Sequence, residues 1–242
     1  MSQPLYKQVK NEIVASLVRN EWPPGEMLPS EKQLAARFSV AVSTVRAAIG
    51  ELADAGVVVR TQGKGTCVAH HNARGNVYRF FNVVRNGGEK EAFHRELLSL
   101  RKERADARAI AQLHLPAQSA PPQVYRLRIK LSAAFPAFAY AEIVLPCHLF
   151  SGLAAKGIPD GASSLYSFYQ STFGVNIVRV EEALYAVRAG PLVSKVLELP
   201  TSEPLLRIER VAFALGSTPV ELRTTWVHTR HYHYYTAQGS SD

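Results

Sequence analysis

The stretch that decides the fold runs from Leu28 to Ala69 and reads LPSEKQLAARFSVAVSTVRAAIGELADAGVVVRTQGKGTCVA. Ser30 and Gln33 have the spacing of a capping box, in which two side chains cap the same helix N-terminus. Apolar residues then recur at helical spacing, and the pattern stops at Ser39-Val40 before a second one begins. This order predicts two short helices joined by a tight turn.

The end of the same stretch predicts a hairpin. Gly56 lies where a left-handed helix cap belongs, and Val57-Val58-Val59 favours a strand. The segment from Arg60 to Thr66 contains two glycines at which the chain can turn, and Cys67-Val68-Ala69 predicts the returning strand. Two helices followed by a hairpin form a winged helix-turn-helix, which implies contact with DNA.

The second helix directs part of its first turns outward, because Val45, Ile49 and Leu52 predict its core face. The residues left to enter a major groove are Ser43, Thr44, Arg46 and Ala47. Arg46 has the chemistry to pair with a guanine edge or a phosphate, and Lys64 lies between two glycines that let it reach a minor groove. The alternative interpretation is a small buried helical pair with ordinary surface charges.

This stretch resembles the DNA-binding domain of GntR-type bacterial transcription regulators. The residues that carry the resemblance are Leu5-Tyr6, Pro24-Gly25, Leu28-Pro29-Ser30-Glu31, Thr44-Val45-Arg46 and Gly63-Lys64-Gly65-Thr66. The resemblance implies that the positions of Lys32, Arg46 and Gly63 approach DNA. Together with the residues placed by pattern, the expected DNA-binding set is Lys32, Ser43, Thr44, Arg46, Gln62, Gly63 and Lys64.

The chain departs from that family at the start of the second helix. Ala41-Val42 stands where the family commonly has Ser or Thr followed by Arg. An alanine gives up a helix cap, at a cost of roughly 1 kcal/mol, and a valine cannot hydrogen-bond to a phosphate or a base. DNA affinity or operator sequence is therefore expected to differ from the family norm. Cys67 replaces a usual aromatic residue, which we interpret as a packing substitution.

Composition places few limits beyond a globular protein of two domains. The 242 residues are 47% apolar, no apolar run reaches the roughly 18 residues of a membrane span, and Met1-Ser2-Gln3-Pro4 lacks a signal-peptide core. We expect a cytoplasmic protein with no membrane partner. Cys67 and Cys147 fall in different predicted domains, which favours reduced thiols over a disulfide.

The predicted domains are a winged helix-turn-helix at 1–70, a linker at 71–76 and a second domain at 77–242. An amphipathic helix carrying Leu5, Val9, Ile13 and Leu17 precedes the helix-turn-helix, and its spacing predicts that it packs beneath it. The formal net charge of +8 suits a polyanionic partner. Most of the excess, however, lies at residues 76–130, so charge alone does not separate DNA steering from binding of an anionic ligand.

The second domain alternates strand and helix signals. Strands are predicted at 78–84, 96–103, 124–131, 138–145, 178–187, 206–215 and 220–228, and helices at 106–113, 163–174 and 190–199. Strands outnumber helices, and short turns join several of them. These features predict an α+β domain on an antiparallel sheet.

This order resembles the UTRA ligand-binding domain of the HutC-like branch of GntR regulators, whose fold is shared with chorismate lyase. The residues that carry it are Arg128-x-Lys130, Ala141-Glu142 to Pro146, Leu149 to Leu153, Ser164-Leu165-Tyr166, Leu205 to Arg210 and Pro219-Val220-Glu221. The resemblance implies that the domain binds a small, often anionic metabolite. Lys130 replaces the more frequent arginine, which keeps the charge but loses the planar fork.

Three features independently suggest an anion site. Arg126, Arg128 and Lys130 share one strand face, and a helix N-terminus at Ser163 and Ser164 offers free N–H groups. Glu221 has the chemistry to orient an amino or hydroxyl group. The expected effector-binding set is Arg128, Lys130, Glu142, Ser163, Ser164 and Glu221. The alternative is that the basic face is solvated, Ser163 only caps a helix, and Glu221 pairs near Arg223.

No metal, cofactor or catalytic site is expected. A metal hypothesis is prompted by His70-His71 and by the set His228, His231 and His233, but a solvated linker and a packed terminal strand are favoured. Catalytic motifs such as a nucleophile elbow or a phosphate-binding loop are missing from the sequence.

We therefore predict a homodimeric transcription regulator, and not an enzyme, whose binding to double-stranded operator DNA is controlled by a small anionic metabolite. The residues leave open an enzyme or metabolite-binding protein of chorismate-lyase-like fold with an appended helix-turn-helix. They also leave open a nonspecific nucleic-acid-binding protein. Turnover of a bound ligand would favour the first alternative, and equal affinity for every duplex the second.

Overall fold

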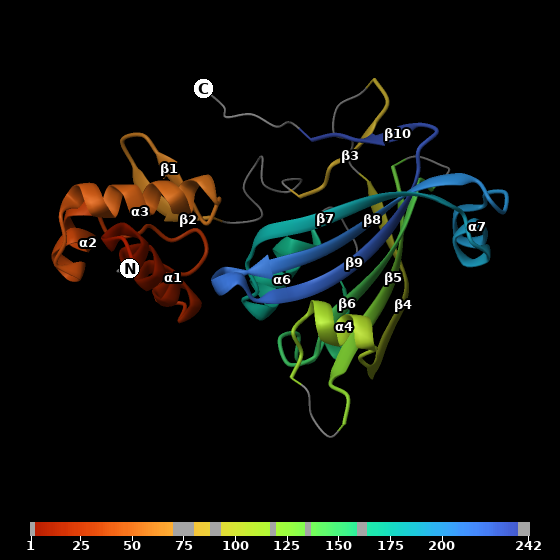
Figure 1. The fold of residues 1–242 in the computed structure, drawn as a ribbon, viewed down its shortest axis with the longest axis horizontal. Coiled ribbons are helices and arrows are strands. Elements are labelled where there is room, and N and C mark those ends of the chain that lie inside the picture. The colour runs from red at the N-terminus through yellow and green to blue at the C-terminus, as the bar shows by residue number, and fades with distance from the viewer. Residues whose placement is uncertain are drawn as a thin grey trace.

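The computed structural model describes residues 3–69, 80–87, 93–116, 120–133, 137–158 and 164–236. A small helical domain lies beside a larger domain built on a long, twisted sheet (Figure 1). Within the described residues, no helix is both long and apolar enough to cross a membrane. The linker predicted at 71–76 falls outside the described residues.

The first domain is the predicted winged helix-turn-helix. Its elements are α1 (Leu5–Val18), α2 (Glu31–Phe38), α3 (Val42–Asp54), β1 (Val58–Thr61) and β2 (Gly65–Val68). The capping box is present: the Gln33 N–H donates to Ser30 Oγ (3.3 Å), and the Ser30 N–H donates to Gln33 Oε1 (2.9 Å). Gly56 follows α3 with φ of 61°, in the left-handed region that glycine adopts without strain.

The core of this domain follows the apolar pattern of the sequence. Ile13 and Leu34 are fully buried, and Ile49 and Leu52 from α3 pack against them. Because these residues occupy one face of each helix, the polar faces are left to solvent. The helix α3, which would be the recognition helix, thereby packs one face against the core and leaves its opposite face exposed.

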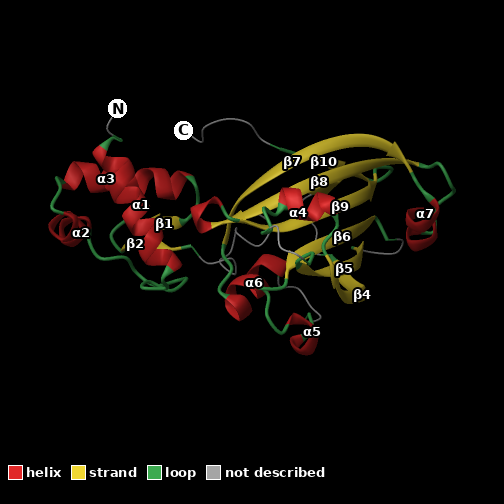
Figure 2. Cartoon of the chain, turned by 60° about the horizontal axis from the view of Figure 1, so that its bottom comes forward, coloured by secondary structure: helices red, strands yellow, loops and turns green. Residues whose placement is uncertain are grey.

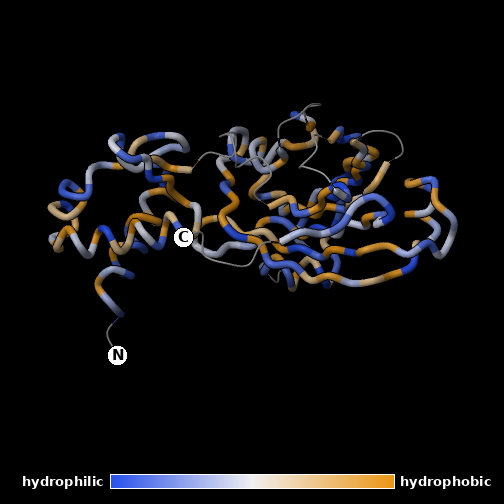
Figure 3. Tube along the Cα trace, turned by 90° about the horizontal axis from the view of Figure 1, so that it is seen from above, coloured by the Kyte–Doolittle hydropathy of each residue, from blue (hydrophilic) through white to orange (hydrophobic). Residues whose placement is uncertain are grey.

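The second domain is built on a six-stranded antiparallel sheet, as predicted. Its strands lie in the order β4-β5-β6-β9-β8-β7. Their bounds are β4 His94–Arg104, β5 Gln123–Ser132, β6 Ala139–Pro146, β7 Ile177–Arg188, β8 Pro204–Ala214 and β9 Pro219–His228. Along these long strands hydrophobic and hydrophilic residues follow one another (Figure 3), so the two faces of the sheet differ in chemistry.

Helices cover both faces of the sheet. The helices α5 (Leu153–Lys156) and α6 (Leu165–Phe173) lie together on one side (Figure 2), where they share the main core with the sheet. The helices α4 (Ala107–Gln112) and α7 (Pro191–Leu197) pack in smaller clusters with residues of the opposite face. We call these the α6 face and the α4 face.

One strand begins later than the sequence predicts, and two features of the fold were not predicted. A strand was predicted at 78–84, whereas β3 is Val83–Arg85, and residues 78 and 79 lie outside the described residues. The partner of β3 is β10 (Tyr232–Tyr234), and the two form a separate antiparallel sheet. That pairing joins residues about 150 positions apart, so no local pattern announces it. The helix α5 was also missed because one helical turn is too short to show a period.

The two domains are in contact. Val178 and Leu215 of the second domain pack against the core of the first, and the Gln170 amide of α6 donates to the Ala69 carbonyl (3.1 Å). Leu215 belongs to a short 3-10 helix, η1 (Leu215–Ser217), which contacts α1. The end of α6 and the β8–β9 turn therefore form the surface on which the helical domain rests.

Candidate DNA interface and effector site

The recognition helix presents the predicted residues to solvent. Ser43 and Arg46 are exposed and Thr44 is half-buried, because the buried Val45 lies between them on the core face. The N-cap of α3 is Ala41, whose backbone has the extended geometry of a cap, but no side-chain hydrogen bond caps the helix. The predicted loss of a cap is confirmed.

An ion-pair cluster holds Arg46 at the edge of this surface. Its Nε donates to Glu31 Oε2 (3.0 Å), while 64% of its side chain remains exposed. Arg60 of the wing donates through Nη2 to the Arg46 carbonyl (2.9 Å) and lies 3.6 Å from Glu31 Oε1. Arg60 was not in the predicted set, although a cation on the wing strand next to the turn was a usable signal.

The remaining predicted residues lie at the tip of the wing and the start of α2. Gln62, Gly63 and Lys64 form the exposed turn between β1 and β2, and Lys32 is exposed in the first turn of α2. Gly63 has φ of 74°, which a glycine adopts without strain. Cations are therefore exposed at the start of α2, on α3 and on the β1–β2 hairpin. Contact with a phosphate backbone requires such cations.

The basic face of β5 does not stand open to an anion. Arg128 Nε donates to Glu142 Oε1 (3.1 Å), and Lys130 Nζ lies 2.6 Å from Glu96 Oε2. Arg126 likewise pairs with Glu103 and, at 3.0 Å, with Asp106. Each cation of this row is therefore balanced by a carboxylate from a neighbouring segment.

Strand register separates the predicted effector residues between two faces. Arg128 lies opposite Glu142, which lies opposite Thr224 on the next strand. Glu221 is three residues before Thr224, and side chains an odd number of positions apart on a strand point to opposite faces. Arg128, Lys130 and Glu142 thus lie on the α4 face, and Glu221 lies on the α6 face with its tyrosine partners.

The helix start is only partly described. Ser163 lies outside the described residues. Ser164 is the N-cap of α6 and accepts a hydrogen bond from the Ser167 N–H (3.1 Å). The six predicted residues are therefore not brought into one site.

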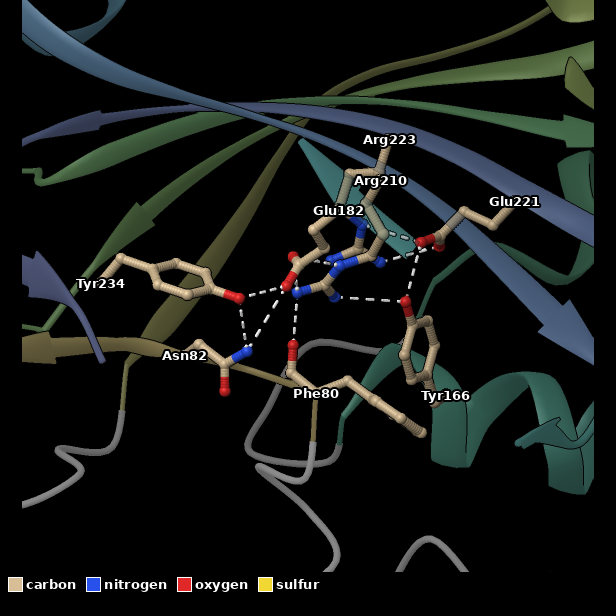
Figure 4. A network of polar contacts seen from close by, with 8 residues as sticks. All are labelled: Phe80, Asn82, Tyr166, Glu182, Arg210, Glu221, Arg223 and Tyr234. Carbon is tan, nitrogen blue, oxygen red and sulfur yellow. Dashed lines mark hydrogen bonds and ion pairs between the residues drawn. The ribbon is translucent and has the colours of Figure 1, made fainter. Parts of the chain in front are cut away.

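The α6 face instead carries a buried polar network around Glu221 (Figure 4). Glu221 has no exposed surface, and it accepts hydrogen bonds from Tyr166 Oη (3.0 Å) and Tyr169 Oη (2.9 Å). Arg223 approaches the same carboxylate in a bidentate manner, through Nε (2.9 Å) and Nη2 (2.7 Å). The alternative that Glu221 pairs near Arg223 is thus what the structure contains, and the pair is buried.

The network continues through Arg210 toward the segment that follows the first domain. Arg210 donates through Nε to Glu182 Oε1 (2.8 Å), through Nη1 to Tyr166 Oη (3.3 Å) and through Nη2 to the Phe80 carbonyl. Glu182 in turn accepts from Tyr234 Oη (2.5 Å), which also accepts from the Asn82 amide (2.9 Å). Figure 4 shows these groups converging from β7, β8, β9, α6 and the 80–82 segment.

Burial and charge shift the titration of these groups. Burial, followed by the negative charge of Glu221, raises the pKa of Tyr166 to about 12. Burial lowers the pKa of Arg223, but the Glu221 carboxylate and the two tyrosines outweigh it, so that the net shift is upward. Arg95 of β4 lies close enough to Arg223 for the like charge, after burial, to lower its pKa. Three arginines and two glutamates therefore share this region, with tyrosines that remain hydrogen-bond donors at neutral pH.

Glu221 and the start of α6 were predicted as site residues, whereas Arg210, Arg223 and Tyr166 were not. Arg210 interrupts the row of Leu206, Ile208 and Ala212 on one face of β8, and this was a usable signal of a charged position on a covered face. The histidines serve other partners, since His228 Nε2 lies 3.2 Å from Glu203 and His233 Nδ1 lies 2.9 Å from Asn86. Over the described ranges, no three His, Cys, Asp or Glu side chains gather as a metal site would require.

Comparison with known proteins finds two family models. Residues 5–68 match the family described as bacterial regulatory proteins, gntR family, and residues 89–233 match the UTRA domain. The mannosyl-D-glycerate transport/metabolism system repressor of Escherichia coli K12 is 25% identical over 205 residues, which cover 84% of this chain and 83% of that protein. The histidine utilization repressor of Klebsiella aerogenes is 32% identical over 114 residues, which cover 47% of each chain.

A solved structure is similar to the second domain. The ligand-binding domain of a protein assigned to the GntR family of transcription regulators, from Bordetella bronchiseptica, aligns with a TM-score of 0.61 and 29% identity. The alignment covers 67% of this chain and 99% of that one.

Proposed function

The chain belongs to the GntR family of bacterial regulatory proteins and carries a UTRA domain of the HutC-like branch, and from that membership we propose how its DNA binding is controlled. It is a transcription regulator, not an enzyme, and a metabolite bound by the second domain controls its contact with DNA. We add that it acts as a homodimer on double-stranded operator DNA, that it represses transcription, and that its effector is a small anion.

The DNA contacts that we propose are those of the exposed cationic surface. Arg46 reads a base edge in the major groove, held in place by Glu31, and Lys64 reaches a minor groove or phosphate from the wing. Arg60, next to Arg46, adds a phosphate contact. Lys32, Ser43, Thr44, Gln62 and Gly63 complete the proposed surface. A dimer is required because two half-sites give the specificity that one recognition helix lacks.

The observation that carries the anionic effector is the cluster of Arg95, Arg210 and Arg223 on the α6 face. Arg210 is buried and pairs with Glu182, Arg223 is half-buried and pairs with Glu221, and the half-buried Arg95 lies near enough to Arg223 for their like charges to interact. Arginine forks match carboxylates and phosphates, and the start of α6 at Ser164 adds N–H groups nearby. Glu221 has no exposed surface, so in this proposal it positions Arg223 and the two tyrosines and does not touch the ligand.

Arg128, Lys130 and Glu142 receive a different role in this proposal. They lie on the α4 face, and carboxylates within 3.1 Å already balance Arg128 and Lys130. We assign them to the stability of the sheet. The relatives named as a mannosyl-D-glycerate transport/metabolism system repressor and a histidine utilization repressor support repression and a metabolite effector.

The contact between Arg210 and the Phe80 carbonyl offers a route from effector to DNA. Phe80 is at the end of the segment that enters the second domain from the first. An anion that binds Arg210 competes with this carbonyl for the same guanidinium and changes how the entering segment is held. Effector and operator must then influence each other reciprocally, with a coupling of about 1 to 3 kcal/mol.

A thermal-shift screen tests this assignment. The ligands are urocanate, amino-sugar phosphates, phosphonates and sugar acids, since a ligand at 100 times its dissociation constant stabilises the folded state by about 2.7 kcal/mol. For a ligand that stabilises the protein, Tyr166→Phe should weaken the shift because it removes one hydroxyl from the network. Arg128→Ala is the matched control and should leave the ligand response intact. The opposite result, response lost in Arg128→Ala and kept in Tyr166→Phe, would move the effector to the α4 face.

A further inference from the structure

A cleft lies between the two domains. Its volume is about 860 Å³, and its walls come from both domains. The first domain contributes the end of α1 and the segment that follows it, with Val18 and Trp22. The second contributes the end of α6 and the β8–β9 turn, with Phe173 and Leu215. The volume is that of a pocket for a small organic molecule.

The chemistry of this cleft is the opposite of that on the α6 face. Among the described residues that line it, none is Lys, Arg, Asp or Glu. Its walls are aromatic and aliphatic, and its polar groups are amides, hydroxyls and the His148 ring. An anion would find no counter-charge here. An uncharged molecule with an apolar body would bury its surface against the walls.

One polar residue of the cleft combines low exposure with the absence of a side-chain hydrogen bond to any described residue. Asn176, just before β7, is 8% exposed and lines the cleft, and it makes no side-chain hydrogen bond to another described residue. Gln170, by contrast, donates to the Ala69 carbonyl. The amide N and O atoms of Asn176 remain accessible, because among the described residues only Arg207 Nε is a buried side-chain polar atom without a partner. A ligand with one hydrogen-bonding group would supply the missing partner.

We propose that the interdomain cleft binds a small uncharged molecule that has an aromatic or aliphatic body and one polar group recognised by Asn176. This site is separate from the anion site of the α6 face. Because the walls belong to both domains, occupancy depends on how the domains sit against each other. The bound molecule therefore favours the domain arrangement described above over any other.

Nile red, a neutral aromatic dye with a carbonyl group, is a suitable probe on the full-length protein. Val18→Trp fills the cleft mouth, and it is a mild change because Val18 is 62% exposed. Leu5→Trp, on the same helix, 52% exposed and outside the cleft, is the matched control. We expect saturable one-to-one binding in the wild type and Leu5→Trp, and at least about tenfold weaker binding in Val18→Trp. Equal binding in the two variants, or no saturable binding in the wild type, overturns the site.

Asn176→Leu tests the recognition of the polar group. Loss of one hydrogen bond should weaken dye binding by about two- to tenfold. The unfolding temperature of the dye-free variant should stay the same or rise, because the replaced amide has no partner to lose. Unchanged dye affinity would remove Asn176 from the site. A lowered unfolding temperature would show that the amide serves the fold and would overturn its role as a ligand group.

Discussion

In the proposed DNA interface, Arg46 is held by neighbouring side chains before it meets DNA. Glu31 and Arg60 fix its backbone and guanidinium before any DNA is present, so less side-chain freedom is lost on binding. Glu31 also lies close to the DNA surface, where its charge offsets part of the attraction to phosphate. The cluster therefore lowers the affinity for DNA somewhat, but it gives the Arg46 side chain a defined orientation.

Arg46→Ala should weaken operator binding by roughly 1 to 3 kcal/mol and relax the base preference at one position. Lys64→Ala should instead lower the dependence of affinity on salt, because it removes a phosphate contact. Fluorescence anisotropy with operator and unrelated duplexes, over a range of KCl concentrations, separates the two effects. If both variants bind as the wild type does and remain folded, this surface is not the DNA interface.

The low pKa of Glu21 implies that the stability of the first domain decreases in acid. The hydrogen bond donated by Arg37, then that of Ser16, lowers the pKa of Glu21 to about 2, below its usual 4.5. Because the folded-state pKa is the lower one, this carboxylate stabilises the domain fully above pH 4.5, and the effect is lost as the pH falls toward 2. Glu21→Gln should therefore lower the thermal stability at pH 6 and have little effect at pH 2. Glu26→Gln, at an exposed position, is the control, and a similar loss in both variants at pH 6 would contradict the assignment.

At the scale of one element, α3 lacks the cap that α2 has. Ala41→Ser should restore a side-chain acceptor for the first N–H groups of the recognition helix and stabilise the domain by about 1 kcal/mol. Ser30→Ala should destabilise it by a similar amount, because it removes the capping box of α2. Urea unfolding followed by the fluorescence of the buried Trp22 measures both. No gain in Ala41→Ser would mean that backbone or water partners already satisfy the helix start.

The elements that could be predicted from the sequence are those with local causes. Ser30, Asp106 and Ser164 each cap the helix that was expected there, and the alternation along β5 matches its two faces. The candidate site, by contrast, depended on pairing between strands that are far apart in the sequence. Whether Arg128 and Glu221 lie on the same face or on opposite faces is determined by the register of three strands, and no single segment of the sequence contains that information.

At the scale of the whole molecule, the polar network connects the C-terminal strand to the entry of the second domain. Tyr234→Phe removes the hydroxyl that links Asn82 and Glu182. Operator affinity without effector should change little, because the residue is far from the DNA surface, while the response to effector should decrease. Tyr235→Phe is the matched control, since its side chain is 57% exposed. Measuring operator binding with and without the stabilising ligand decides the matter, and an equal response in both variants would exclude β10 from the coupling.

The pairing of β3 with β10 also has a consequence for how the protein is made. The recognition helix and wing are complete once residue 69 has been synthesised, whereas β3 must wait for Tyr232. At about 5 to 20 residues per second, the ribosome needs roughly 10 to 30 seconds for that interval. During this time the nascent chain contains the complete DNA-binding domain, while the second domain still lacks β10, the partner of β3. A message truncated shortly before codon 232 would therefore yield a protein that still binds the operator, but whose operator affinity no longer changes when the metabolite is present.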